Sequence, residues 1–206
     1  MPATGNMETA HGMLDAPPKV EEKPEWWAST GTLGLLGFGM TTMLAGLAVG
    51  GWIGAGALLS MALFFGGSAQ VIAGVIALRK GNMFAGSAFT SYGAFWFAFA
   101  WLNTTYAAAG TAYDAPAFFF VWMMVTLTFF LVSWKHGIGV FLVFLTLLIA
   151  FALLTVNAWE VAAGTALAKS AMQGIGGEII LTGLLAWLTA TADLVNWQFG
   201  RKVLPI

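Results

Sequence analysis

The chain has 206 residues, of which 59% are hydrophobic and 8% are charged. Water-soluble domains carry about 25% charged residues, so this composition excludes a soluble globular protein and indicates an integral membrane protein. The net charge is −1 with no basic block, which argues against a nucleic-acid partner, and the absence of cysteine excludes disulfides and thiolate metal sites.

Residues 1–27 differ from the rest of the chain. They hold five of the nine acidic residues, several prolines and almost no aliphatic run. Such a segment cannot bury enough apolar surface to offset its ordering entropy, so we expect a disordered N-terminal tail. It lacks the basic and then apolar start of a signal peptide. Trp26 and Trp27 are expected at the first membrane interface, where indoles prefer to lie.

The remaining residues, 28–206, are predicted to form one all-α domain of six transmembrane helices. No charged residue occurs in 33–78, which is too long for one helix and suits two, because a span needs about 20 apolar residues to cross about 30 Å of hydrocarbon. The turn between these two helices is expected at Gly50, Gly51 and Trp52. The polar run 79–82 closes the second helix.

Four further helices follow. The third is predicted over 84–107, with an exit loop at 113–116, and the fourth over 117–134, with a break at 135–137. The fifth reaches about Val156, and a polar loop through Lys169 and Gln173 follows it. The sixth ends near Val195.

Loop charge predicts the orientation. With six spans, the tail, the second and fourth loops and the C-terminus share one side, which carries Lys19, Lys23, Arg79, Lys80, Lys135, Arg201 and Lys202. The opposite side carries only Lys169. Basic loops stay on the cytoplasmic side, so we expect a multi-pass protein of the cell membrane with both termini in the cytoplasm.

Ionisable residues are scarce within the predicted helices. His11 falls in the tail and His136 in a loop, while Glu178 and Asp193 are expected near the two ends of the sixth helix. No cluster resembles a metal site, a nucleophile with its base or a pair of carboxylates, so the sequence predicts neither an enzyme nor a bound cofactor. A proton-coupled carrier usually needs a titratable relay in the membrane. The sequence instead favours passage of an anion, or of an acid that carries its own proton.

Uncharged polar residues are plentiful in the helices, and two interpretations stay open. Ser and Thr side chains can hydrogen-bond within or between helices, or they can line a water-filled path. Phe38 shares a helical face with Thr41 and Thr42, and Ser87 shares one with Ser91. The glycines at 46, 50 and 54 suit close helix packing, either within one subunit or between subunits.

Three stretches resemble the acetate uptake transporter family, whose bacterial members include the succinate–acetate permease. They are "LGLLGFGMTTML" at 33–44, "GGSAQVIAGVIALRKGNMFAGSAFTSYGAFW" at 66–96 and "NWQFGRKVLPI" at 196–206. The family pattern opens with Asn-Pro-Ala-Pro, whereas this chain has Ser29, Thr30, Gly31 and Thr32. We therefore expect a differently shaped pore mouth, with Ser29 or Thr30 capping the first helix.

The resemblance implies a fold, a function and a set of site residues. It implies a homohexamer of six-helix protomers, each with a central pore that passes acetate and in some members succinate or other short carboxylates. The implied constriction is formed by Phe38, Tyr92 and Leu147. Ala186 is implied to be a small pore-facing position that tunes substrate size, and Thr41, Thr42, Gln70 and Ser91 are candidates for the polar lining.

Two other functions remain as alternatives. The chain could be a channel for another small solute, of the urea or ammonia type, although ammonia channels tend to place histidines in the pore and both histidines here fall outside the predicted helices. It could also be a non-conducting membrane sensor or scaffold, in which the polar stripe serves only for packing.

Overall fold

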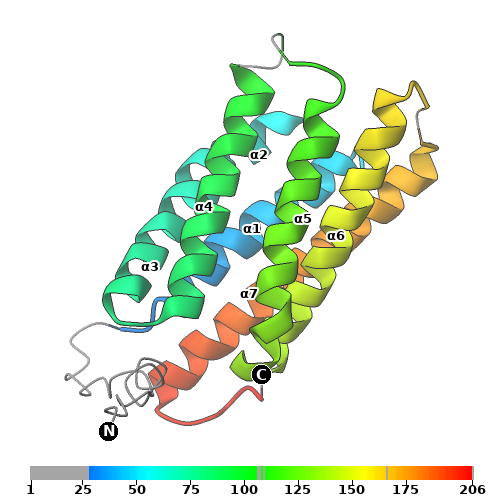
Figure 1. Cartoon of the computed structure of the whole chain (residues 1–206). Helices are drawn as coiled ribbons and strands as arrows, with labels where there is room; N and C mark the ends of the chain where they lie inside the picture. Colours follow the sequence, from blue (N-terminus) through cyan, green and yellow to red (C-terminus); the bar gives the residue numbers. More distant parts are fainter. Residues whose placement is uncertain (1–27, 106–107, 109, 166, 206) are drawn as a thin grey trace, which may run out of the picture.

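The computed structural model describes residues 28–105, 108, 110–165 and 167–205, and these form a bundle of long helices (Figure 1). The predicted tail at 1–27 lies outside the described residues, as does Ala107, the expected end of the third span. The helices are α1 (Gly31–Val49), α2 (Ala55–Met61), η2 (Ala62–Gly67), α3 (Ser68–Arg79), α4 (Met83–Thr104), α5 (Asp114–Ser133), η3 (Trp134–His136), α6 (Ile138–Ala162) and α7 (Lys169–Phe199).

The second span consists of three helical pieces in direct succession. α2 runs into a π-helical segment, η2, and then into α3, so that 55–79 crosses the bundle as one unit. The wider π turn ends in the pair Gly66 and Gly67, which contact other helices where a side chain would not fit. A Cβ atom on Gly66 would lie 2.8 Å from Oγ1 of Thr41, and one on Gly67 would lie 2.5 Å from the ring of Phe97. Such π segments are frequent at functional sites.

Six spans alternate in direction through the bundle, which confirms the predicted count. The start of α1, the α3–α4 turn, the α5–α6 turn and the end of α7 lie at one end of the molecule (Figure 1). We call this the terminal end and the opposite one the loop end. Among the described residues, five spans are long and apolar enough to cross a membrane by length and composition, and the sixth, α4, is 22 residues long and rich in aromatic residues.

Glycines hold α1 directly against α7. A Cβ atom on Gly39 would lie 2.8 Å from the carbonyl oxygen of Gly183, and one on Gly46 would lie 2.5 Å from that of Gly176. The two backbones therefore touch at two levels, and Gly46 packs within one chain. Gly54 shares the four-residue spacing of Gly46, but a Cβ atom there would meet nothing within 4 Å, so this glycine lies in open space.

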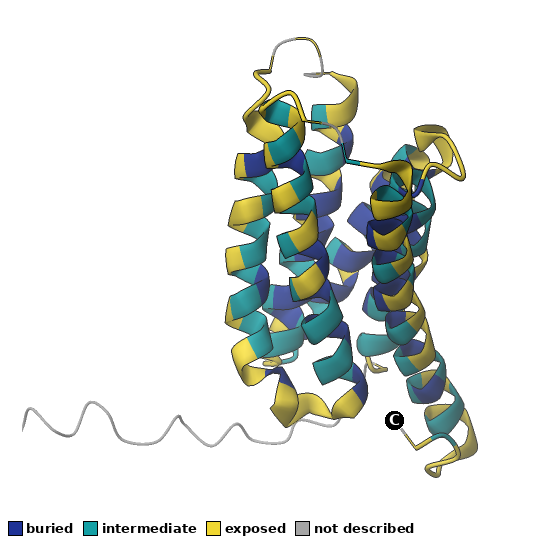
Figure 2. Ribbon diagram, turned by 90° about the vertical axis from the view of Figure 1, so that its right-hand side faces the viewer, coloured by how far each residue is buried: buried dark blue, intermediate teal, exposed yellow. Residues whose placement is uncertain are grey.

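The outside of the bundle is apolar. Residues such as Phe64 and Leu131 are exposed to 78% and 64%, while buried residues gather on the helix faces turned inward (Figure 2). A soluble protein would carry polar side chains at these positions. An apolar exterior around an apolar core is the arrangement of helices surrounded by lipid.

Several predicted boundaries are wrong. The fifth helix extends to Ala162 rather than Val156, and the polar loop expected through Lys169 and Gln173 belongs to α7, which begins at Lys169. Both segments are less apolar at the loop end, where a helix can continue beyond the hydrocarbon and keep its polar side chains in water. Glu178 therefore lies in the third turn of α7, not near its end. The predicted turn at Gly50, Gly51 and Trp52 is confirmed.

The start of α1 is anchored to α7. Oγ1 of Thr32 donates to Oδ2 of Asp193 at 2.7 Å, and Oγ of Ser29 lies 3.4 Å from the same oxygen. The backbone N–H of Gly31 donates to Oγ of Ser29 at 3.3 Å, whereas Thr30 makes no side-chain cap. Of the two predicted capping residues, Ser29 accepts a hydrogen bond from the first residue of α1, and Thr30 makes no such bond.

Candidate functional site

Three side chains meet in the middle of the bundle, from α1, α4 and α6. Phe38, Tyr92 and Leu147 are each buried to at least 95% and belong to one core cluster. The rings of Phe38 and Tyr92 pack edge to face with their centroids 5.7 Å apart. The three residues that resemblance assigned to the constriction are thus brought together, and we call this group the neck.

A cavity of about 180 Å³ lies on the terminal side of the neck. We call it the terminal cavity. Its wall is mainly aromatic and aliphatic, with the amide of Gln70 and the imidazole of His136 as exceptions. Its lining residues are Gly31, Leu35, Phe38, Gln70, Phe84, Ala85, Ala88, Phe89, Tyr92, His136, Val140, Val143, Phe144 and Leu147.

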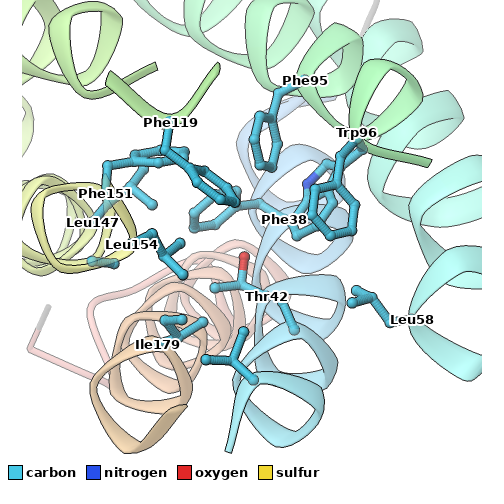
Figure 3. Close-up of a pocket in the computed structure, with 14 residues that line it drawn as sticks. Phe38, Thr42, Leu58, Phe95, Trp96, Phe119, Leu147, Phe151, Leu154 and Ile179 are labelled. Atoms are coloured by element: carbon cyan, nitrogen blue, oxygen red, sulfur yellow. The ribbon is translucent and has the colours of Figure 1, made fainter. Parts of the chain in front are cut away.

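A second cavity, of about 60 Å³, lies on the other side of the neck, and we call it the central cavity. Figure 3 shows the hydroxyl of Thr42 directed toward the surrounding rings, with Trp96 beside Phe38. Phe38 and Leu147 line both this cavity and the terminal one. The two side chains therefore form the partition between the cavities. Each cavity exceeds the about 10–15 Å³ that one water needs.

A third cavity, of about 440 Å³, continues the series toward the loop end. We call it the loop cavity. It shares Phe99 and Phe119 with the central cavity, and its wall includes the polar residues Asn103, Thr111 and Asp114. The central cavity thus shares lining residues with both the terminal and the loop cavity, and the three follow the bundle from one end toward the other.

The hydroxyl of Tyr92 is hydrogen-bonded to another helix and is therefore not free to bind a solute in the cavities. It lies 2.9 Å from Oγ1 of Thr126 on α5, and that oxygen donates to the carbonyl of Trp122 at 2.7 Å. Because the single hydrogen of Thr126 is used for the carbonyl, Tyr92 must be the donor to Thr126. Tyr92 thus presents its ring to the neck while its hydroxyl is bound to the wall.

Other buried polar groups beside the path have no partner. The side chains of Thr42 and Trp96 line the central cavity, and that of Gln70 lines the terminal cavity. Each of these side chains is at least 97% buried, and none of their polar atoms makes a hydrogen bond within the described residues. A buried donor without a partner is costly, so these groups are suited to a polar solute or water in the cavities.

The remaining predicted site residues lie away from the cavity walls. Thr41 is fully buried against Gly66, and Ser91 is half-buried on α4, and neither lines any of the three cavities. Ala186 is fully buried in the core cluster that contains the neck, and its Cβ lies 3.1 Å from the position that a Cβ on Gly39 would take. It therefore lies behind the neck, against the residue that follows Phe38.

No described acidic residue lines the terminal or the central cavity. Asp193 is bonded at the start of α1, and Glu178 lies 3.4 Å from Oγ1 of Thr182 on its own helix. Neither carboxylate lines any of these three cavities, and Asp114 lines only the loop cavity among them. Within the described ranges, no group of three or more His, Cys, Asp or Glu side chains is placed to hold a metal ion.

Sequence reasoning missed Trp96, Thr126 and His136 as residues of this site. Trp96 stands at the end of a matched motif, but nothing local distinguishes it from the other nine tryptophans. Thr126 is a single hydroxyl in an apolar helix, which is more often bonded to its own backbone. His136 falls in a loop, and only the packing of that loop onto Phe84 brings its ring to the cavity wall.

Comparison with known proteins agrees with this architecture. The profile of the GPR1/FUN34/yaaH family matches residues 14–203. The chain is 36% identical over 187 residues to the succinate-acetate/proton symporter SatP of Escherichia coli K12, across 87% of this chain and 95% of that protein. It is 27% identical to the ammonia transport outward protein 2 of Saccharomyces cerevisiae, across 84% of this chain and 63% of that protein.

A solved structure, that of the bacterial acetate channel SatP, matches the fold with a TM-score of 0.79 and 35% sequence identity. The match covers 87% of this chain and 99% of that one. It agrees with the resemblance indicated by the three sequence motifs. The chain belongs to the GPR1/FUN34/yaaH family.

Proposed function

We propose that this protein is a membrane channel or transporter for acetate and for succinate or other short carboxylates. The observation that carries the proposal is that Phe38 and Leu147 line two cavities at once, so that one thin apolar partition separates two spaces on the axis of the bundle. The family membership and the names of the symporter and channel among its relatives support the choice of solute.

The two ends of acetate suit the two kinds of wall. Its methyl group fits against the apolar neck, and its carboxylate is proposed to accept hydrogen bonds from Gln70 on one side and from Thr42 and Trp96 on the other. The neck itself offers no donor, because the hydroxyl of Tyr92 is bound to Thr126. A bare anion therefore meets its main desolvation barrier at the neck, and a narrow apolar neck can also gate by dewetting.

Size selection is proposed to reside at the neck and behind it. Phe38, Tyr92 and Leu147 set the width directly, and Ala186 acts through its contact with α1 at Gly39. A larger side chain at Ala186 would move Phe38 toward the axis. Thr41 and Ser91, the other two candidates for the polar lining, contribute mainly to packing in this proposal, since neither lines a cavity.

The proposed orientation follows from the distribution of basic residues between the two ends of the molecule. Arg79, Lys80, Lys135, Arg201 and Lys202 lie at the terminal end and Lys169 at the loop end, which supports cytoplasmic termini in a multi-pass protein of the cell membrane. A homohexamer with one pore in each protomer is proposed by resemblance to the family. The proposal includes no enzymatic activity and no cofactor.

Uptake of labelled acetate by proteoliposomes tests the function. We expect flux that saturates or is reduced by unlabelled formate, lactate and succinate. Competition by ammonium or urea would instead favour a channel of the urea or ammonia type. Ammonium is included because one relative is named an ammonia transport protein. A sensor or scaffold would show no flux above that of protein-free liposomes.

A further inference from the structure

We propose that His136 is the anion-recognition residue of the terminal cavity, which attracts the carboxylate of the solute when its imidazole is protonated. The proposal rests on the transport function proposed above and adds a group that can carry a positive charge to the neutral donors already proposed, Gln70, Thr42 and Trp96. It assigns a role to a side chain that neither the sequence motifs nor the constriction includes.

The position of His136 is fixed by stacking. Its ring lies parallel to that of Phe84, with the centroids 3.8 Å apart and an interplanar angle of 14°. Phe84 is in turn packed edge to face against Phe129 and Phe144. The short helix η3 ends at His136, and Gly137 follows with φ of 97°, a conformation that favours glycine and turns the chain sharply into α6. The imidazole is therefore held at the cavity wall although the residue remains exposed.

His136 is the one side chain lining the terminal cavity that can carry a positive charge, among the lining residues the structure describes. The other ionisable group in that wall is the phenol of Tyr92, which donates to Thr126. Histidine is the side-chain type that gains its charge as the pH falls from about 8 to about 5. A charge at this position would lie between the surrounding water and a mostly apolar cavity, so it would attract anions to the mouth of that cavity.

None of the other described charged groups at the terminal end lines the terminal cavity; they are Arg79, Lys80, Lys135, Asp193, Arg201 and Lys202. On η3, Nζ of Lys135 lies over the ring of Trp134, 4.1 Å from its centroid. On α7, Asp193 lies beside Gly31 and accepts the hydroxyl of Thr32. At the α3–α4 turn, Nζ of Lys80 donates to the carbonyl of Ala28, and Arg79 precedes it.

The helices packed around His136 add no charge at this end. The acids of α5 and α6 are Asp114 and Glu160, both at the loop end, and α4 carries no charged residue. No carboxylate therefore lines the terminal cavity to neutralise a protonated imidazole.

Uptake of labelled acetate at about pH 6 and about pH 8, equal inside and outside the liposomes, tests the proposal. After subtraction of the flux into protein-free liposomes, we expect the unmodified protein to transport about threefold faster or more at the lower pH. His136→Gln should bring the ratio of the two rates to about one. His136→Lys should give a ratio of about one with a high rate at both values, because its charge is permanent. Lys135→Gln is the matched control and should keep the original ratio.

A second measurement separates recognition from simple stacking. His136→Phe keeps an aromatic ring against Phe84 but cannot be charged, so it should behave like His136→Gln. In the His11→Gln protein, His136 is the only histidine, and acetate should shift its imidazole NMR signal at about pH 6 and not at about pH 8.

The proposal is overturned if His136→Gln keeps the ratio of the unmodified protein, which would mean that the acid carries its own proton past a neutral mouth. It is also overturned if acetate leaves the NMR signal unchanged at both pH values. Absence of acetate flux in the unmodified protein would instead contradict the transport function itself.

Discussion

The hydroxyl of Tyr92 lies 2.9 Å from Oγ1 of Thr126, inside the bundle and between α4 and α5. The backbones of these two helices come close to each other at few places, and aromatic side chains fill most of the space between them. Around this hydrogen bond, the ring of Tyr92 packs against Phe38, Trp122, Phe129 and Phe144. The bond therefore sets the direction in which the ring meets the neck.

Removal of this bond should loosen the neck. Thr126→Val leaves the hydroxyl of Tyr92 buried without an acceptor, which costs about 1–3 kcal/mol and frees the ring to turn. We expect a lower unfolding temperature in detergent and a higher ratio of succinate to acetate uptake. Thr128→Val on the exposed face of α5 is the control, because that hydroxyl bonds only to its own helix. If Thr126→Val matched this control in both measurements, the bond would contribute neither to stability nor to the choice between acetate and succinate.

The indole N–H of Trp96 should contribute to solute binding in the central cavity. Trp96→Phe keeps the aromatic contacts and removes the donor. A hydrogen bond to a charged group is worth about 1.5–3 kcal/mol, so we expect KM for acetate to rise by about tenfold or more. Trp101→Phe, further along α4 and exposed to 55%, should leave KM near its original value. An unchanged KM for Trp96→Phe, with the fold intact by circular dichroism, would remove Trp96 from the binding path.

The contact between α1 and α7 predicts that alanine substitutions at two adjacent glycines, Gly176 and Gly177, affect stability very differently. A methyl group on Gly176 would lie 2.5 Å from the carbonyl oxygen of Gly46, whereas one on Gly177 meets nothing within 4 Å. Gly176→Ala should therefore separate the helices and lower the unfolding temperature, and Gly177→Ala should be close to neutral. Thermal unfolding of both variants in the same detergent compares them directly. Equal stabilities would show that the two helices do not touch as described.

Membrane carboxylates should be dispensable for flux. Glu178 and Asp193 line none of the three cavities, so neither is placed to relay protons to a solute in the path. We expect the protein with Glu178→Gln and Asp193→Asn together to keep most of its acetate flux in liposomes and the pH dependence of that flux. Loss of the pH dependence in a correctly folded protein would indicate a carboxylate relay.

The fold was largely predictable because its main signals are local. Apolar runs of the right length predict spans, and glycine and charged clusters predict the turns, which is why the turn at Gly50, Gly51 and Trp52 is predicted correctly. The errors fall where a helix leaves the hydrocarbon. Beyond Val156 and before Gln173 the polar side chains look like a loop in the sequence, yet the backbone continues as helix because water accepts those side chains.

The site was predictable only in part. Phe38 and Tyr92 lie in motifs that resemble a known family, and the structure brings both to Leu147. The partners that complete the site depend on tertiary packing. Thr126 meets Tyr92 across two helices, and His136 reaches a cavity wall from a turn. Ser91, next to Tyr92 in sequence, points to a different side because neighbours on a helix are separated by about 100°.

The accessibility of position 147 tests the central claim most directly. The protein has no cysteine, so Leu147→Cys introduces a single thiol at the neck, and Leu131→Cys introduces one on the outer surface of α5. We predict that a small, water-soluble thiol reagent blocks acetate flux through the Leu147→Cys protein, that excess acetate slows the block, and that modified Leu131→Cys protein still transports. Full modification of Leu147→Cys with unchanged acetate flux would contradict a path between Phe38 and Leu147.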